Sequence, residues 1–284
     1  MGAGIAQVLA AKGHGVLLND VDDARVRAGV EGIVKRLARE VEKGKTGSEQ
    51  RDEILARIEP RANFRDLDVD LAIEAATERL DLKLELFRTL DANTPPAAIL
   101  ASNTSSISIT MLGAATSRPE RVIGMHFMNP VPVMKLVEII RGIATTDATF
   151  AAVRDLATGL DKTPVEVRDF PGFISNRVLL PMINEAIYAL YEGVASVDAI
   201  DTVMKLGMNH PMGPLTLADF IGLDTCLAIM NVLHEGFGDS KYRPCPLLKQ
   251  YVAAGWLGKK SGRGFYDYSA NANGAAVAVP AVAR

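Results

Sequence analysis

The opening segment "MGAGIAQVLAAKGHGVLLND" limits the fold more than any other part of the chain. Its small residues lie on one face of a predicted helix, Gly13 ends that helix, and "GVLLND" predicts a strand that closes on Asp20. A helix that leads at once into a strand forms the second part of a βαβ unit, whose two strands run parallel. The segment therefore predicts a parallel sheet with a strand before Gly2.

Predicted strands and helices alternate along the chain as far as about Arg168. The strands are mostly continuous apolar runs, as expected for strands buried on both faces: "DLAIEAATE", "AILASNTSS", "RVIGMHFMNP", "MKLVEII" and "TPVEVRD". Helices are expected at about 24–43, after a turn at 43–48 up to about 59, at 79–94 and at about 147–159. This order predicts an α/β fold with a doubly wound, mostly parallel Rossmann-type sheet that is truncated at its first strand.

The hydrophobic pattern becomes helical from Gly172 to Gly255, so an all-α domain is expected to follow the sheet. We place the boundary at Asp169–Gly172, with a sheet domain at 1–168 and a helical domain at 169–268. Its helices are expected at 174–192, 197–206, 214–221, 224–236 and 246–255. The Ala/Val-rich segment 269–284 is expected to be a disordered tail.

The composition excludes several classes of protein. Apolar residues make up 48% of the 284 residues and charged residues 23%, which suits a protein with a full core rather than a disordered chain. The net charge of −3 gives no support for nucleic-acid binding. No uncharged apolar run reaches the roughly 18 residues of a membrane span, and the two cysteines lack metal-ligand spacing. We therefore expect a cytoplasmic protein without a membrane segment or a metal site.

The glycines of the opening segment match part of the dinucleotide-binding fingerprint G-x-G-x-x-G. Either Gly2 and Gly4 are its first two glycines, with Gln7 in the third place, or Gly2 is its third glycine. The second alternative is favoured because the first leaves no room for a preceding strand. Asp20 lies where a carboxylate binds the ribose diol of NAD; the alternative role for it is a helix N-cap.

The tripeptide "GKT" at Gly44–Thr46 is similar to the end of a nucleotide-phosphate loop. That motif requires a glycine where this chain has Arg39, and it follows a strand, which is not expected here. We interpret Gly44 instead as the residue that ends the preceding helix.

His126 in "GMHFMNP" and Glu138 in "MKLVEII" are the strongest candidates for chemistry. Glu138 lies in an apolar strand, where a carboxylate is costly unless it is neutralised or paired. A histidine on a neighbouring strand is a suitable partner, and the pair would form a general base or acid near neutral pH. The alternative is a histidine satisfied within the core and a glutamate that faces solvent.

Two further polar residues are candidates for ligand binding. Ser105 follows the strand "AILAS", and open α/β sheets bind ligands at the carboxyl ends of their strands. Its alternative role is a helix N-cap. Asn176 lies in the first turn of the long helix of the second domain, where it either caps locally or reaches a substrate oxygen across the domain cleft.

Five segments occur in order along the chain: "ASNTSSISIT", "GMHFMNPVPVMKLVEII", "PGFISNRVLLPMINEA", "NHPMGPLTLADFIGLD" and "GKKSGRGFYDY". Together they closely resemble the 3-hydroxyacyl-CoA dehydrogenase family, and within it the short bacterial members that act on 3-hydroxybutyryl-CoA. The resemblance extends from Gly2 to Tyr268. It implies reversible, NAD-dependent oxidation of an (S)-3-hydroxyacyl-CoA to the 3-oxoacyl-CoA, in fatty-acid metabolism such as β-oxidation.

The resemblance also implies roles for individual residues. His126 corresponds to the catalytic histidine and Glu138 to the carboxylate paired with it, whereas Ser105 and Asn176 correspond to residues that bind and polarise the substrate. The positions implied to contact NAD are Gly2, Asp20, Glu78, Lys83, Ser105, Asn129 and Lys260.

The family resemblance further implies an acyl-CoA partner and a homodimer. Arg36 and Lys43 lie near positions that meet coenzyme A, although a solvated, charged helix face explains them equally well. The apolar helices of the second domain, such as "VLLPMINEAIYALY", exceed what one core face needs, and we expect them to form the dimer contact.

Family members carry a strand ending in "GAG", and two more residues, before the glycine that corresponds to Gly2. Without that strand we expect an open slot between neighbouring strands and fewer backbone donors for the phosphates. We expect in-frame codons upstream of Met1 to encode an apolar strand and "GAG".

Two other functions are compatible with the fold. One is a dehydrogenase of free hydroxy acids or sugar acids, which would not depend on a coenzyme A thioester. The other is a non-catalytic nucleotide-binding or structural protein, against which the joint presence of Ser105, His126, Glu138 and Asn176 argues.

Overall fold

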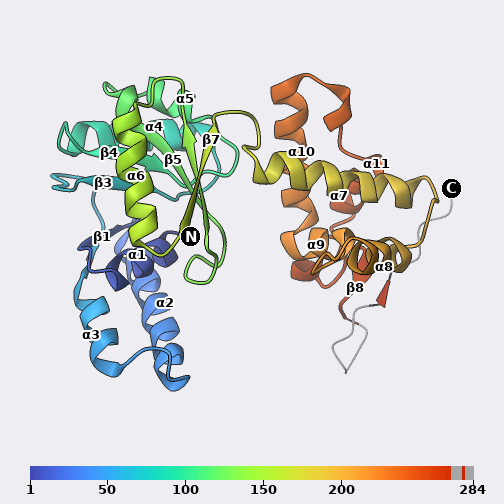
Figure 1. The fold of residues 1–284 in the computed structure, drawn as a ribbon, viewed down its shortest axis with the longest axis horizontal. Helices are drawn as coiled ribbons and strands as arrows, with labels where there is room; N and C mark the ends of the chain where they lie inside the picture. Colours follow the sequence, from blue (N-terminus) through green and yellow to red (C-terminus); the bar gives the residue numbers. More distant parts are fainter. Residues whose placement is uncertain (270–276, 279–284) are drawn as a thin grey trace. The chain divides into compact units, whose positions relative to one another are not determined.

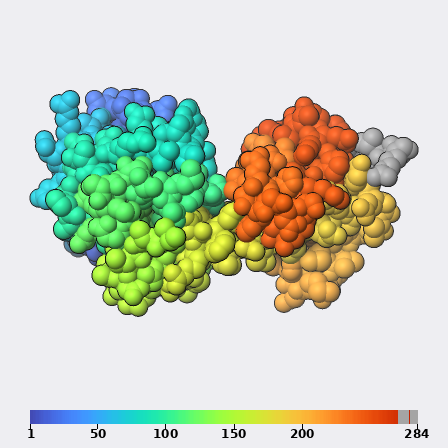
Figure 2. Space-filling model, turned by 90° about the horizontal axis from the view of Figure 1, so that it is seen from above, coloured from blue at the N-terminus to red at the C-terminus, as the bar shows by residue number. Residues whose placement is uncertain are grey.

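The computed structural model describes residues 1–269 and 277–278, and the chain divides between Phe170 and Pro171 into two units (Figure 1). Figure 2 shows the surface of each unit, coloured blue to yellow-green for the first and yellow to red-orange for the second. The first unit contains, in chain order, α1 (Gly2–Ala11), β1 (Val16–Asn19), α2 (Asp23–Glu42), α3 (Ser48–Ala56), β2 (Ile58–Arg61), β3 (Leu71–Glu74), α4 (Leu80–Asn93), β4 (Ile99–Ser102), α5 (Ile109–Ala114), a 3₁₀ turn (Pro119–Arg121), β5 (Val122–Phe127), β6 (Leu136–Arg141), α6 (Asp147–Gly159) and β7 (Thr163–Arg168).

The main sheet of the first unit has the strand order β3-β4-β5-β6-β7. β3, β4 and β5 are parallel, but β6 pairs antiparallel with β5, and β7 runs parallel to β6. The segment between β5 and β6, residues 128–135, is too short for a parallel crossover, which needs about a dozen residues or more. The expected α/β sheet is confirmed, with its last two strands reversed.

Helices cover both faces of this sheet (Figure 1). α6 lies against one face, where Val153 belongs to the same buried cluster as Met125 and Ile139. α5 contacts the other face, where Gly124 leaves room for Ile140, since an added Cβ would lie 2.7 Å from Ile140 Cβ. The sheet is therefore enclosed like the centre of a doubly wound fold.

β1 and β2 form a separate parallel ladder, with Val16 opposite Ile58. The prediction of a helix up to about 59 is wrong at this point, because α3 ends at Ala56 and the short strand β2 follows. The strand tolerates Pro60 since β2 pairs on one side only within the first unit, all of whose residues are described.

No ladder hydrogen bonds join β1 to β3 within this fully described unit. A cavity of about 540 Å³ lies there, lined by Val16 and Leu17 of β1 and by Val69 and Asp70 before β3, among others. The divided sheet agrees with the open slot expected from the sequence.

Local signals explain where the first helices begin and end. The N-cap of α2 is Asp22, whose side chain accepts a hydrogen bond from the Arg25 amide, so the alternative role of Asp20 as that cap is wrong. Gly44 has a φ of +66° just after α2, which confirms that "GKT" belongs to a helix end.

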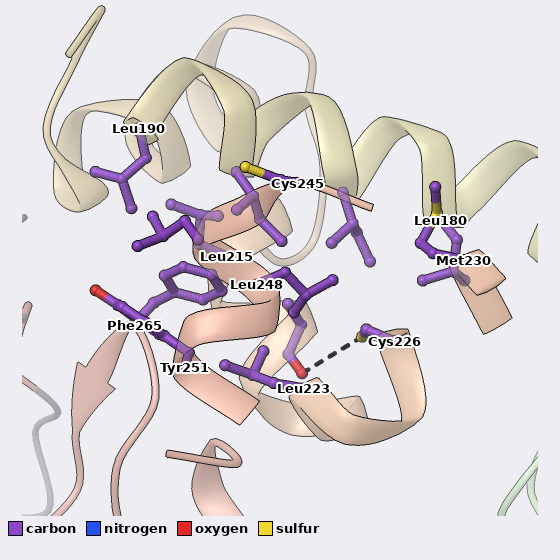
Figure 3. Packing of buried hydrophobic residues seen from close by; sticks show 14 of the residues in the cluster. Leu180, Leu190, Leu215, Leu223, Cys226, Met230, Cys245, Leu248, Tyr251 and Phe265 are labelled. Carbon is purple, nitrogen blue, oxygen red and sulfur yellow. Dashed lines mark hydrogen bonds between the residues drawn. The ribbon is translucent and has the colours of Figure 1, made fainter. Parts of the chain in front are cut away.

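The second unit is built from α7 (Ser175–Tyr191), α8 (Val197–Gly207), α9 (Pro214–Ile221), α10 (Leu223–Phe237) and α11 (Pro246–Ala253), with 3₁₀ turns at Ser240–Tyr242 and Lys259–Ser261. Figure 3 shows side chains from α7, α9, α10 and α11 packed in one buried cluster that includes Phe265. The dashed line in that view is the Cys226 thiol donating to the Ala218 carbonyl at 3.9 Å. The expected helical domain is confirmed, with small shifts at its helix ends.

A short strand pair is added to these helices. β8 (Tyr266–Asp267) pairs antiparallel with β9 (Val277–Ala278), so the unit is not wholly α-helical. Of the predicted tail 269–284, only residues 269 and 277–278 lie within the described part of the chain. No single helix of the described residues is long and apolar enough to cross a membrane. Taken together, α9 and α10 have the length and apolar composition of a membrane span, but they are bent by 98° where they meet.

Two buried aspartates fasten the segment "GRGFYDY" to the helices. Asp219 of α9 accepts hydrogen bonds from the amides of Phe265 and Tyr266, at 3.0 and 2.9 Å. Asp201 of α8 accepts from the Leu215 amide at 2.8 Å and from the Tyr266 hydroxyl at 2.9 Å. Burial raises the pKa of Asp219 to about 6. The segment therefore has a structural role in closing this core.

We expect Gly264→Ala to lower the free energy of unfolding by about 1–3 kcal/mol, because a tightly packed site must shift to accept a methyl group. The added Cβ would lie 1.9 Å from Asp219 Oδ1 and 2.7 Å from Gly258 Cα. Urea unfolding measures the loss. The matched control is Gly207→Ala in the same unit, where the nearest atom is 4.0 Å away, on Val203. Equal unfolding midpoints for both variants would contradict the role given to Asp219.

Candidate active site

His126 and Glu138 form a buried pair across two strands. They are directly opposite each other in the antiparallel β5–β6 ladder, where facing side chains lie close together. His126 Nδ1 lies 2.8 Å from Glu138 Oε2, and the two residues are 7% and 2% exposed. The predicted pairing is confirmed, and the alternative of a solvent-facing glutamate is wrong.

The other ring nitrogen of His126 faces Ser105. The Ser105 hydroxyl lies 2.9 Å from His126 Nε2. Ser105 is not the N-cap of the next helix, because Ser108 caps α5 by accepting a hydrogen bond from the Met111 amide. With Nδ1–H donating to the Glu138 carboxylate, Nε2 carries the lone pair that can accept a proton.

Glu78 holds the loop that carries Ser105. Its Oε1 accepts hydrogen bonds from the amides of Ser105 and Ser106, at 2.9 and 3.0 Å, and from the hydroxyls of Thr104 and Ser106. Burial alone would raise the pKa of Glu78, but these donors and the Lys83 ammonium hold that pKa below its ordinary value. Glu78 therefore remains ionised and organises the loop.

Lys83 and Glu74 lie behind Glu78. The Lys83 ammonium is 2.7 Å from Glu74 Oε1 and 3.5 Å from Glu78 Oε2, and the Lys83 side chain is 1% exposed. The expected contact of Lys83 with NAD does not match this placement, because the Lys83 ammonium is buried and paired with these two carboxylates. Lys83 instead touches the site through its two acidic partners.

Glu74 and Ser102 are members of the site that the sequence reasoning missed. Ser102 donates its hydroxyl hydrogen to Glu74 Oε2 at 2.7 Å and accepts from the Thr104 amide at 3.1 Å. A signal for Glu74 was present, since it is a carboxylate within the apolar strand "LAIE", just as Glu138 is within "LVEII".

Residues expected to bind a dinucleotide lie at strand ends and at the start of α1. Asp20 directly follows β1, and its carboxylate accepts a hydrogen bond from the Val21 amide at 2.8 Å. An added Cβ on Gly2 would lie 3.7 Å from Ala75, so α1 begins beside the residue that follows β3. α1 has no side-chain cap and no acidic residue in its first turn, so its amide groups suit an anion such as a pyrophosphate.

The other first-unit candidates lie in different settings. Asn129 is exposed in the loop after β5, and Lys43 is exposed at the end of α2. Arg36 donates from Nε to Gln7 Oε1 at 2.8 Å and from Nη2 to the Ala3 carbonyl at 3.3 Å. Arg36 therefore joins α2 to α1.

Two candidates belong to the second unit. Asn176 lies in the first turn of α7, whose N-cap is Ile174. The Lys260 ammonium bonds Asp224 Oδ2 at 2.7 Å in the first turn of α10.

Comparison with known proteins identifies the family. Residues 1–170 match the family model for the 3-hydroxyacyl-CoA dehydrogenase NAD binding domain, and residues 172–268 match the model for the 3-hydroxyacyl-CoA dehydrogenase C-terminal domain. The chain belongs to the 3-hydroxyacyl-CoA dehydrogenase family. Its first unit is accordingly the NAD-binding domain, which fits the uncapped start of α1 and the carboxylate of Asp20 after β1.

Individual relatives cover nearly the whole chain. A probable 3-hydroxybutyryl-CoA dehydrogenase of Bacillus subtilis is 62% identical over 269 residues, which is 94% of each chain. The 3-hydroxybutyryl-CoA dehydrogenase of Bradyrhizobium diazoefficiens is 60% identical over 94% of this chain and 92% of its own length. The crystal structure of (S)-3-hydroxybutyryl-CoA dehydrogenase from Ralstonia eutropha is 53% identical, with a TM-score of 0.93 over 95% of each chain.

Proposed function

We propose that this protein is an NAD-dependent dehydrogenase that reversibly oxidises (S)-3-hydroxybutyryl-CoA to acetoacetyl-CoA. The observation that carries the proposal is the arrangement Ser105–His126–Glu138, with contacts of 2.9 and 2.8 Å on the two ring nitrogens of His126. This arrangement suits proton transfer to or from a substrate oxygen. The names of relatives at 60–62% identity supply the substrate class.

In the oxidation direction His126 Nε2 takes the proton of the C3 hydroxyl. Glu138 orients the imidazole through Nδ1 and stabilises the positive charge that the ring acquires. The ring is held on a buried strand pair, so its geometry is set before substrate binds. NAD held by the first unit would supply the acceptor for the hydride that leaves C3.

We assign the remaining residues by the same proposal. Ser105 and Asn176 bind and polarise the substrate oxygen, and Arg36 and Lys43 lie toward the coenzyme A part of the substrate. NAD contacts are assigned to Gly2, Asp20, Glu78, Ser105, Asn129 and Lys260, with Lys83 acting through Glu78.

We also propose that the protein is a cytoplasmic homodimer that works in fatty-acid metabolism such as β-oxidation. The second unit exposes several large apolar side chains, which a partner subunit would cover: Val178, Val203, Leu206, Met208 and Phe220. Light scattering of the purified protein tests the dimer, and a monomeric mass would contradict it.

The activity is tested by following NADH absorbance after acetoacetyl-CoA is added. We expect the absorbance to fall with acetoacetyl-CoA and to change little with free acetoacetate, because the free acid lacks the coenzyme A group. Equal rates with both compounds would favour a dehydrogenase of free acids. No change with either compound, while NADH still binds, would favour a non-catalytic nucleotide-binding protein.

A further inference from the structure

We infer that Glu74 is a positioning residue of this enzyme, which acts through Lys83, Glu78 and Ser102 to hold the loop that carries Ser105. The expected change in kcat rests on the proposed function, whereas the expected change in amide exchange of the loop rests on the structure alone. Glu74 bonds Lys83 and Ser102, and these two residues connect it to Glu78 and to the Thr104 amide.

The first route from Glu74 to the loop is electrostatic. Glu74 lies at the end of β3 with a side chain that is 3% exposed, and its Oε1 is 2.7 Å from the Lys83 ammonium. A buried ammonium needs a nearby carboxylate, because an uncompensated charge is costly in the interior. Glu74 fixes Lys83 in this position, and Lys83 in turn lies 3.5 Å from Glu78 Oε2.

The second route runs through the Ser102 hydroxyl. The Ser102 hydroxyl donates to Glu74 Oε2, and Ser102 Oγ accepts a hydrogen bond from the Thr104 amide. A hydroxyl has one hydrogen, so its donation to Glu74 orients the lone pairs of Ser102 toward Thr104. Glu74 thereby determines which way the Ser102 hydroxyl points.

The two routes meet on three consecutive amides. The Thr104 amide is held by Ser102 at 3.1 Å, and those of Ser105 and Ser106 are held by Glu78 at 2.9 and 3.0 Å. These bonds fix the backbone from which the Ser105 hydroxyl reaches His126 Nε2. A small displacement of a reacting group costs a large factor in rate, so a loosened loop lowers turnover.

The first experiment measures the loop without any need for turnover. Hydrogen–deuterium exchange at the amides of residues 104–106, followed by NMR, is expected to accelerate in Glu74→Gln and in Glu78→Gln. Glu74→Gln keeps the shape of the side chain but removes the charge that holds Lys83. Unchanged exchange in Glu74→Gln would overturn the inference, whether or not the protein is a dehydrogenase.

The matched control is Asp91→Asn. Asp91 forms another mostly buried ion pair in the same unit, 2.8 Å from Arg118 Nε, and it belongs to none of the bonds that hold residues 104–106. It is expected to destabilise the unit without faster exchange at these three amides. Equal acceleration in Asp91→Asn and Glu74→Gln would reduce Glu74 to a general stabilising residue and overturn the inference.

The second experiment asks whether Glu74 acts through Ser105. We expect Glu74→Gln to lower kcat by about 10- to 100-fold, with KM for acetoacetyl-CoA changed far less. In a Ser105→Ala background the same substitution is expected to have little further effect, because the group that it positions is already missing. Full multiplication of the two losses would overturn the positioning role. Absence of turnover in the unmodified protein would instead reject the proposed function and leave the exchange result standing.

Discussion

His126→Gln is expected to lower kcat by about 10²–10⁴-fold, the usual contribution of a general base, while KM for the acyl-CoA changes little. Glutamine can still donate a hydrogen bond to Glu138, but its side chain cannot accept the substrate proton near neutral pH. The rate of NADH oxidation with acetoacetyl-CoA, measured over a range of substrate concentrations, checks the expectation. Turnover equal to that of the unmodified protein would reject His126 as the proton-transfer group.

The matched control is His14→Gln. His14 is exposed in the turn between α1 and β1, so its substitution is expected to leave kcat unchanged. Glu138→Gln should also lose activity, because a neutral amide neither stabilises the imidazolium nor fixes the ring in one tautomer. A large loss in His14→Gln would show that the assay reports general damage rather than proton transfer.

The second large effect concerns the divided sheet of the first unit. A chain extended before Met1 by an apolar strand, Gly-Ala-Gly and one linking residue is expected to bind NADH about 10²-fold or more tightly than residues 1–284. The strand would pair with β1 and β3, and the glycine turn would offer backbone donors to the pyrophosphate. Two hydrogen bonds to a charged group, at about 1.5–3 kcal/mol each, give an effect of this size.

Fluorescence titration with NADH measures the two affinities. The control carries the same strand with Val-Ala-Val in place of Gly-Ala-Gly, so that the ladder is completed while valine side chains block close approach of the phosphates. The control is expected to gain stability and to gain little affinity. Equal affinity of all three proteins would mean that the cavity beside β1 and β3 has no bearing on NAD binding.

The sequence was sufficient to predict the pairing of His126 with Glu138. The reason was energetic, since a carboxylate within an apolar strand requires a partner. The same reasoning applies to Glu74 in "LAIE", whose partners Lys83 and Ser102 lie nine and twenty-eight residues away. Glu74 is harder to identify from the sequence, because the apolar pattern of "DLAIEAATE" continues past it to Glu78.

Two features of the fold followed from weaker signals. The reversal of β6 depends on the short segment 128–135, and apolar patterning alone does not give the direction of a buried strand. β2 has the sequence "IEPR", whose polar residues and proline give no strand pattern. Its pairing with β1 arises from tertiary contact rather than from local preference.

The divided sheet has a consequence for cooperativity. Residues up to Arg61 share no sheet hydrogen bonds with β3–β7 within this fully described unit. They pack against the main sheet through buried side chains such as Ile5, which belongs to the same cluster as Met125. Such a segment can unfold locally, as a separate cooperative unit, before the rest of the first unit unfolds. A dinucleotide that contacted both Asp20 and the residues after β3 would bind only when this segment is folded against the main sheet. Its binding would therefore lower the free energy of the folded segment, and ligand affinity would depend on local folding.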